Sequence, residues 1–529
     1  MNQHDPQPRT IPVVIIGAGP VGLSLALGLA NLGVRSVLLE RKPSTSEHSK
    51  APALHVRTRE ILRGWGVEHA LREAGTLLET MPVFTATGRR RLEFDFTGLA
   101  EEAEQPGILF LEQGTTERLL LQALLATGRC EVYFDTEATA VEPGEYTTAV
   151  TYYTQGQSRM LHAEFSVGCD GARSMVRTAL GLAFEGATLP VRATLADVRV
   201  QDERDALPWP RNNNGPRGIT SAMRLSPQLW RLIRVERGET VPGDSVPGDS
   251  VPGETVPAEE VATWVREVLG SGPAPVVWAS RFQFQQRSSP RYRVGRVLLA
   301  GDAAHVFPPV MGQGMNAGIQ DANNLAWKLA AALDGGDTER LLASYDTERR
   351  HAVGTVSAYV ERRARLGISA PRVVRAGLLA VMRATMAIPV ARRRSLRSLA
   401  MLDRGYAASA LLEANDRCAG MRLPDPVLLG PKGQQVRLHD ALPPGAVLLR
   451  IDREAPSGTE TATFPDVAEM ACLRIGPGGY RDPAGLLREV LGSREGWILV
   501  RPDRHVAWTR TEVEGLHEAV RRALGRVRG

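Results

Sequence analysis

Cysteine is scarce in this sequence, and the few cysteines form no motif. Four occur among 529 residues, at Cys130, Cys169, Cys418 and Cys472, and no two of them make a Cys-x-x-Cys pair. This spacing argues against a disulfide framework, a zinc site and a thiol–disulfide centre. We therefore expect no bound metal and a reducing compartment, the cytoplasm.

A strong charge of one sign and an uninterrupted membrane-spanning run are also lacking. The net charge is only +5, and the run "ARRR" at 391–394 fits a solvated helix face. The stretch from Ile11 to Ala30 is long and apolar enough for a membrane helix. Glycines and a proline interrupt its first half, which argues against one. These features favour a globular protein that binds neither nucleic acid nor a membrane.

The same apolar stretch predicts a nucleotide-binding unit of strand, tight turn, helix and strand. Gly17 permits the turn, Gly19 lets a pyrophosphate approach the backbone, and Gly22 lets helix and strand pack closely. The helix that starts at Pro20 offers free N–H groups to phosphates, and Glu40 ends the second strand where it can accept hydrogen bonds from a ribose. The unit predicts a bound dinucleotide without distinguishing NAD from FAD.

Two further segments favour FAD. An apolar strand delivers Asp170 and Gly171, with Ser174 at a helix start soon after, and another delivers Gly301 and Asp302. A carboxylate held at the end of a strand suits the ribityl chain of a flavin, whose hydroxyls need acceptors. After the second of these segments comes a joint rich in glycine and proline, "HVFPPVMGQGMN", which is typical of a turn built around a ligand.

Three motifs occur in this order: the glycine-rich turn that begins at Gly17, the pair Asp170-Gly171 and the pair Gly301-Asp302. They resemble the motifs of the FAD-dependent aromatic hydroxylases, which are single-component flavoprotein monooxygenases of the para-hydroxybenzoate hydroxylase fold. The resemblance covers roughly residues 11 to 350, and the third motif is its most specific part. It implies that a helix beginning near Gly314 aims its positive end at the flavin ring. The residues that it places at the ring are Pro309, Gly312, Gly314 and the backbone of Met315 and Asn316.

Weaker positions are carried over from the same resemblance. Gln113 lies where the family has a glutamine that touches the cofactor, and Arg41 directly follows the ribose carboxylate. Lys50 replaces an arginine near the pyrophosphate, which keeps the charge but loses the planar fork. We expect His305 to pack or cap, and the catalytic residues stay unknown because the substrate region has no motif of its own.

The predicted fold class is α/β. A Rossmann-type FAD-binding domain would occupy residues 1–180 and 291–420, with a β-sheet substrate domain at 181–290 inserted between them. The repeat "VPGDSVPGDSVPGETVP" predicts an exposed loop within 238–257, since Pro-Gly pairs prevent helix and ladder formation. Residues 421–529 resemble the thioredoxin-like C-terminal domain of many such hydroxylases, without a Cys-x-x-Cys pair.

The function implied by the resemblance is hydroxylation of a phenolic or polyketide-type aromatic substrate. NAD(P)H would reduce the FAD as a transient visitor, and O2 would form a flavin C4a-hydroperoxide that donates an oxygen. The expected partners are thus a small aromatic molecule, O2 and a second copy of the chain in a homodimer.

Four other functions are compatible with parts of the sequence. Baeyer–Villiger oxygenation on the same fold and a non-catalytic FAD-binding protein stay open. A flavin-dependent halogenase is disfavoured because none of the eight tryptophans forms a Trp-x-Trp-x-Ile-Pro motif. An NAD-dependent dehydrogenase would not need the second and third motifs.

Overall fold

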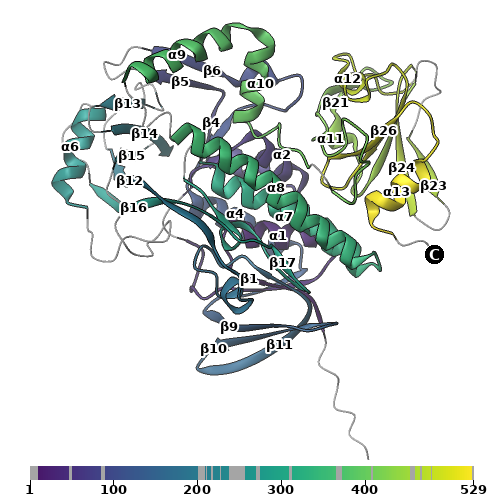
Figure 1. The fold of residues 1–529 in the computed structure, drawn as a ribbon, viewed down its shortest axis with the longest axis horizontal. Coiled ribbons are helices and arrows are strands. Elements are labelled where there is room, and N and C mark those ends of the chain that lie inside the picture. The colour runs from purple at the N-terminus through teal and green to yellow at the C-terminus, as the bar shows by residue number, and fades with distance from the viewer. Residues whose placement is uncertain are drawn as a thin grey trace, which may run out of the picture.

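The computed structural model is arranged around a central sheet. A second sheet lies to one side of it and a C-terminal domain to the other (Figure 1). The structure describes residues 10–46, 51–84, 90–200, 209, 211–215, 218–226, 228–237, 256–269, 275–308, 312–364, 372–406, 409–452, 459–464, 468–477 and 479–526. Within these residues, no helix combines the length and the apolar character that a membrane span requires.

The central sheet brings the strands of all three motifs together. Strands β18, β11, β1 and β2 are parallel neighbours, so their carboxyl ends lie along one edge. The strands of this sheet are β1 (Ile11–Ile16), β2 (Ser36–Leu39), β8 (Cys130–Tyr133), β9 (Thr136–Pro143), β10 (Thr148–Thr154), β11 (Gln157–Gly168), β17 (Arg293–Val294) and β18 (Val297–Leu299).

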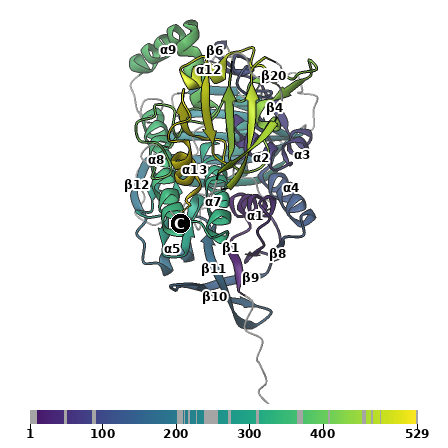
Figure 2. The ribbon, with the colours of Figure 1, turned by 90° about the vertical axis from the view of Figure 1, so that its right-hand side faces the viewer.

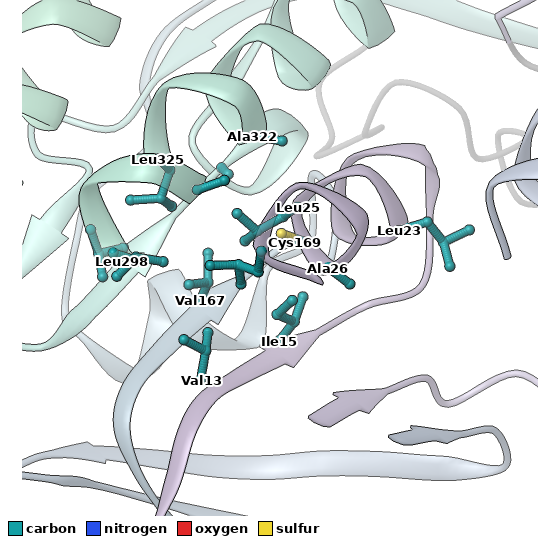
Figure 3. Close-up of a cluster of buried hydrophobic side chains, with 14 of the residues drawn as sticks. Val13, Ile15, Leu23, Leu25, Ala26, Val167, Cys169, Leu298, Ala322 and Leu325 are labelled. Atoms are coloured by element: carbon teal, nitrogen blue, oxygen red, sulfur yellow. The ribbon is translucent and has the colours of Figure 1, made fainter. Parts of the chain in front are cut away.

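Helices cover the central sheet, and the apolar core lies between the helices and the sheet. The apolar stretch that could have been a membrane span forms β1 and α1 (Pro20–Asn31). All residues of α1 from Gly22 to Ala30 are buried. Leu23 and Leu25 of α1 belong to the same apolar cluster as Leu325 of α7 (Gln313–Leu333) (Figure 3). α4 (Gln113–Ala126) and α8 (Thr338–Ala364) complete this layer.

The second sheet is the inserted β-sheet that the sequence predicts, and its role towards a substrate stays a prediction. Its order is β13-β14-β15-β12-β16-β19, and Val261 and Trp264 of α6 (Ala258–Leu269) pack against it. The strands are β12 (Glu185–Arg199), β13 (Arg211–Gly215), β14 (Gly218–Ser226), β15 (Leu229–Arg237), β16 (Val276–Ser288) and β19 (His305–Val306). The repeat loop predicted at 238–257 lies outside the described residues except for its last two residues, Val256 and Pro257.

Shorter elements surround these sheets. Among them, the β5–β6 hairpin was not foreseen from the sequence. The elements are β3 (Ala53–Leu54), β4 (Thr76–Leu78), β5 (Thr80–Phe84), β6 (Arg90–Asp95), β7 (Ile108–Phe110), α2 (Val56–Gly64), α3 (Glu68–Ala74), α5 (Met175–Ala179), α9 (Arg372–Ala387) and α10 (Pro389–Leu399).

The C-terminal domain has its own mixed sheet, in the order β23-β24-β22-β25-β26. Its two cysteines, Cys418 and Cys472, are free, and Cys472 is buried in β24. The α/β prediction is confirmed, and the thioredoxin-like description stays a prediction. The elements are β20 (Val427–Leu429), β21 (Gln435–Arg437), α11 (Leu438–Ala441), β22 (Val447–Ile451), β23 (Thr459–Phe464), β24 (Ala468–Ile475), α12 (Leu486–Leu491), β25 (Gly496–Val500), β26 (Val506–Arg510) and α13 (Leu516–Leu524).

A buried ionic network joins this domain to the helices of the central domain. Arg501 donates to both oxygens of Glu348 on α8, at 2.6 and 2.9 Å, and also to Asp503. Glu348 in turn accepts from Lys328 and Asn324 of α7, each at 2.7 Å. The side chains of the three ionic partners Lys328, Glu348 and Arg501 are wholly buried. The domain seen in front of α7 and α8 in Figure 2 is therefore bound to them by charge as well as by apolar contact.

This network makes stability depend on pH. Burial, aided by Arg501 and opposed by Glu348, lowers the pKa of Lys328 from 10.5 to about 7. An unfolded lysine keeps the higher pKa, so between these values the unfolded chain binds more protons and the free energy of unfolding rises with pH. We expect urea unfolding to show this rise between pH 7 and 9 in the wild type but not in Lys328→Met. Parallel curves for both proteins would contradict the assignment.

Candidate functional site

The carboxyl edge of the central sheet brings the three sequence motifs side by side. The backbone N–H of Gly17 donates to Leu39 O at 2.8 Å, and that of Cys169 to Ile16 O at 2.7 Å. Ala300 N donates to Gly168 O at 3.0 Å, which places the third motif next to the second. Ligands of open α/β sheets bind in the crevice at this edge.

The glycines of the first motif differ in their surroundings. Gly17 has a φ of +105°, and a Cβ there would lie 2.5 Å from Cys169 O. A Cβ at Gly22 would lie 1.9 Å from Gly17 O, so this position is closed by packing. A Cβ at Gly19 would meet no described atom within 4 Å. The turn is thus packed at its base and open at Gly19, which fits a phosphate that approaches the backbone there.

The first turns of α1 and α7 can both accept an anion. In the described part of the chain, neither helix has a side chain that caps its N-terminus, and α1 begins at Pro20. Their first N–H groups are therefore left for another partner, with the positive end of each helix dipole behind them. Two uncapped helix starts near one sheet edge fit a ligand with separate negative centres.

Glu40 closes the first motif as predicted. Its carboxylate accepts from the backbone N–H of Ala18 at 2.7 Å and from that of Lys42 at 3.0 Å. These bonds fix the carboxylate at the end of β2, beside the turn. The neighbouring Arg41 is exposed.

Asp170 has a local role that the sequence reasoning did not foresee. Its two oxygens accept from the Ser174 hydroxyl at 2.6 Å and from Val176 N at 3.1 Å, so it holds the start of α5. Burial raises the pKa of Asp170, and these hydrogen bonds oppose that rise. Arg177 of α5 donates to Ala303 O at 2.9 Å and thereby ties the second motif to the third.

The third motif presents its carboxylate outward. Asp302 is exposed, while Gly301 is buried with a φ of +62° and donates its N–H to Asp321 at 2.9 Å. His305 is buried and 2.7 Å from the same Asp321 carboxylate, so the expectation that it packs is confirmed. Burial alone would raise the pKa of Asp321, but His305 and Arg349 lower it below its ordinary value.

The start of α7 is shaped by glycine and by a buried amide. Gly312 caps the helix with a φ of +66°, and a Cβ at Gly314 would meet no described atom within 4 Å. Met315 is buried. Gln313 is wholly buried, and within the described residues its amide nitrogen and oxygen find no hydrogen-bond partner. Such amides are rare in proteins, so a group other than the polypeptide is expected to satisfy this one.

Asn316 anchors the start of α7 through its side chain. Its amide oxygen accepts from His55 N at 2.8 Å, and its nitrogen donates to Ala53 O and Gly312 O at 2.8 and 2.7 Å. From the sequence we expected only the Asn316 backbone to take part. These bonds fix β3 against the helix that the flavin ring is predicted to face.

Removing this anchor should loosen the fold. We expect Asn316→Ala to lower the free energy of unfolding by about 1–3 kcal/mol, because buried backbone groups lose their partners. Urea denaturation of the FAD-free chain measures this directly. Asn31→Ala serves as a control, since the Asn31 side chain is exposed and donates only to Leu27 O; equal losses in both variants would contradict the anchor.

Of the remaining predicted positions, the structure describes Gln113 but not Lys50 or Pro309. Gln113 accepts from Ala51 N at 3.1 Å and donates to Glu117 at 2.8 Å, so it holds the segment before β3. The polar contacts of Asp321 and Arg177 could not be predicted from the sequence, because they join separate elements and leave no local motif. The buried Gln313 amide likewise has no sequence signature.

The comparisons with known proteins agree with this geometry. The family described as FAD binding domain matches residues 10–359. The family described as aromatic-ring hydroxylase, C-terminal, matches residues 416–527. The chain belongs to the FAD-dependent aromatic hydroxylases.

Relatives match the hydroxylase along almost its whole length. It is 35% identical over 515 residues to the "Uncharacterized aromatic compound monooxygenase YhjG" of Bacillus subtilis, which covers 94% of this chain and 93% of that protein. It is 31% identical to the 12-dehydrotetracycline 5-monooxygenase/anhydrotetracycline 6-monooxygenase of Streptomyces rimosus, over 97% of this chain and 98% of that protein. The solved structure of OxyS anhydrotetracycline hydroxylase from Streptomyces rimosus superposes with a TM-score of 0.77 at 31% identity, over 97% of this chain and 99% of that one.

The hydroxylase is thus an FAD-dependent monooxygenase that acts on a small molecule. The open space at Gly19, the uncapped starts of α1 and α7 and the exposed Asp302 fit a flavin dinucleotide laid along the edge of the sheet. Bound there, FAD supplies the oxygen-activating chemistry, and the protein supplies binding, orientation and electrostatics.

Proposed function

We propose that the hydroxylase adds one oxygen atom to a polycyclic, polyketide-type aromatic substrate. The observation that carries the proposal is the match along almost the whole chain to enzymes named for such substrates, the anhydrotetracycline hydroxylases. The structure of an aklavinone-11 hydroxylase with FAD and aklavinone also superposes, with a TM-score of 0.77 at 25% identity, over 99% of this chain and 100% of that one.

The side chains near the start of α7 support an aromatic substrate. Ala53, which accepts from Asn316, belongs to an apolar cluster with Phe94 and Phe110, and Trp209 packs edge-on to Phe110 with ring centroids 5.5 Å apart. Methionines from several elements pack on or in this cluster: Met81, Met223, Met382 and Met386. Aromatic rings and flexible thioethers suit a large planar ligand, because they adapt to its shape without requiring polar groups.

The chain's own residues would hold and orient the reactants. The first N–H groups of α7 would stabilise negative charge on the pyrimidine side of the flavin, and the apolar cluster would hold the substrate away from water. Reduction by NAD(P)H and oxygen transfer from a C4a-hydroperoxide belong to the same proposal. Assembly as a homodimer and location in the cytoplasm are proposed with it on the sequence alone.

A second candidate is catalysis without oxygen transfer. The "Dialkyldecalin synthase" of Streptomyces rugosporus is 29% identical over 97% of this chain and 98% of that protein. Its name describes no oxygenation, so the fold alone does not determine the reaction. Baeyer–Villiger oxygenation is a further alternative on the oxygenase side.

One experiment separates these functions. The FAD-loaded enzyme is incubated with NADPH or NADH and a panel of phenols, anhydrotetracycline-like and anthracyclinone-like compounds, under ¹⁸O2. If the proposal is right, a substrate makes coenzyme oxidation faster, and the product contains one ¹⁸O atom. Its carbon rings keep their size, with no oxygen inserted into a ring. A lactone product would support Baeyer–Villiger chemistry, and conversion without label would support the synthase alternative.

A further inference from the structure

A pocket with several charged side chains in its lining lies beside the third motif, between the second sheet and α8. Its volume is about 600 Å³. Glu185 and Arg287 line it from β12 and β16, Phe307 from the segment after β19, and Arg350 and His351 from α8. No role described above uses this pocket.

The two guanidinium groups in the pocket have weak partners. Arg287 donates to Phe184 O at 3.4 Å and to the Thr188 hydroxyl at 3.5 Å, both uncharged. Arg350 is 3.5 Å from Asp346, whose carboxylate already accepts from a backbone N–H. Charge-assisted hydrogen bonds are normally about 2.7–2.9 Å long. Among the described residues, Arg287 therefore has no anionic partner, and Arg350 has a long, partly exposed ion pair with Asp346 at 3.5 Å.

The pocket is connected to the flavin motifs by a short chain of contacts. Phe184, which accepts from Arg287, lies under the Arg177 guanidinium at 3.9 Å from its ring centroid. Arg177 donates to Ala303 O in the third motif. Phe307 also lines the pocket and stacks on His305, which binds Asp321 beneath that motif. A ligand here would lie next to the edge where FAD is bound.

We propose that this pocket binds the phosphate groups of the nicotinamide coenzyme. The inference rests on the proposed function, which requires NAD(P)H. The sequence contains no second Gly-x-Gly-x-x-Gly unit, so the coenzyme phosphates cannot rely on a second such helix start and need side-chain cations. Arg287 and Arg350 supply those cations, since a planar guanidinium matches a phosphate with two parallel hydrogen bonds.

The rest of the lining suits the sugar and base of the same ligand. Glu185 offers a carboxylate to ribose hydroxyls, and Phe307 and Val353 add apolar contact. His351 is exposed at the mouth, where it can add a donor. The volume of about 600 Å³ is large enough for a phosphorylated nucleoside and not only for a bare ion.

The test uses the FAD-loaded enzyme and oxidised NADP⁺, so that binding is measured without turnover. We expect calorimetry to show that Arg287→Leu and Arg350→Leu each weaken NADP⁺ binding roughly tenfold or more. Inorganic pyrophosphate should compete with NADP⁺ in the wild type. The matched control is Arg340→Leu, because Arg340 is on the same helix but donates to Ala410 O outside the pocket.

Flavin absorbance and the unfolding midpoint show whether each variant is folded. Arg350 is nearly half exposed, so its variant keeps the test valid if Arg287→Leu does not fold. Unchanged NADP⁺ affinity in both pocket variants, or an equal loss in Arg340→Leu, would overturn the proposal. Neither result would affect the ¹⁸O experiment, so failure of this site is distinguishable from failure of the monooxygenase function.

Discussion

Arg501→Met should lower the free energy of unfolding by about 3–5 kcal/mol, the range for breaking a buried ion pair from one side. The wild-type guanidinium lies between Glu348 and Asp503 and is itself wholly buried. Methionine fills similar space but leaves two buried carboxylates to share Lys328 and His505. Urea unfolding of the FAD-loaded enzyme at pH 7.5, followed by circular dichroism, measures the loss.

Arg510→Met is the matched control for this variant. Arg510 lies on β26 of the same domain, its side chain is 41% exposed, and its nearest carboxylate is Glu413 at 3.9 Å. An exposed pair of this kind contributes about 0–1 kcal/mol. A loss below 1 kcal/mol in Arg501→Met, or similar losses in both variants, would show that the buried network does not stabilise the domain contact.

Gly19→Ala should weaken FAD binding at least tenfold while leaving the FAD-free chain nearly as stable as the wild type. Gly19 has a φ of −72°, which alanine adopts freely, and its added Cβ would meet no described atom. As an N-cap change it should cost less than about 1 kcal/mol. The methyl group would instead occupy the space through which the pyrophosphate approaches the backbone. Fluorescence titration with FAD and urea unfolding of the apoprotein measure the two effects.

Two other glycines make this result specific. Gly22→Ala would place a Cβ 1.9 Å from Gly17 O, so the apoprotein itself should lose stability. Gly64→Ala, at the end of α2, meets no described atom and should change neither property. If Gly19→Ala binds FAD as the wild type does, the pyrophosphate does not approach this turn.

The sequence was most informative where local rules act. The β1 unit, its glycines and the strand ends before Asp170 and Gly301 could be located, because buried parallel strands are continuous apolar runs that end in turn residues. The inserted β-sheet expected at 181–290 could also be located, and β12, β14 and β15 belong to it. Each of these signals is contained in a short stretch of the chain.

The contacts that could not be predicted join distant parts of the chain. The Asn316 side chain forms hydrogen bonds with the backbone of Ala53 and His55. The Asp321 carboxylate forms hydrogen bonds with Gly301, His305 and Arg349. An Asn or Asp within a helix has no periodic signature that names its partner. The pocket at Arg287 and Arg350 is likewise formed by two elements that meet only after folding.

The buried network also bears on how the molecule comes apart. Arg501 and Asp503 belong to the last thirty or so residues of the chain, yet Arg501 pairs with Glu348 on α8 and Asp503 accepts from Asn324 on α7. Without the C-terminal domain, the buried Glu348 carboxylate would lose Arg501 as its partner. A calorimetric scan should therefore show one cooperative melting event, with bound FAD raising the transition of both parts together.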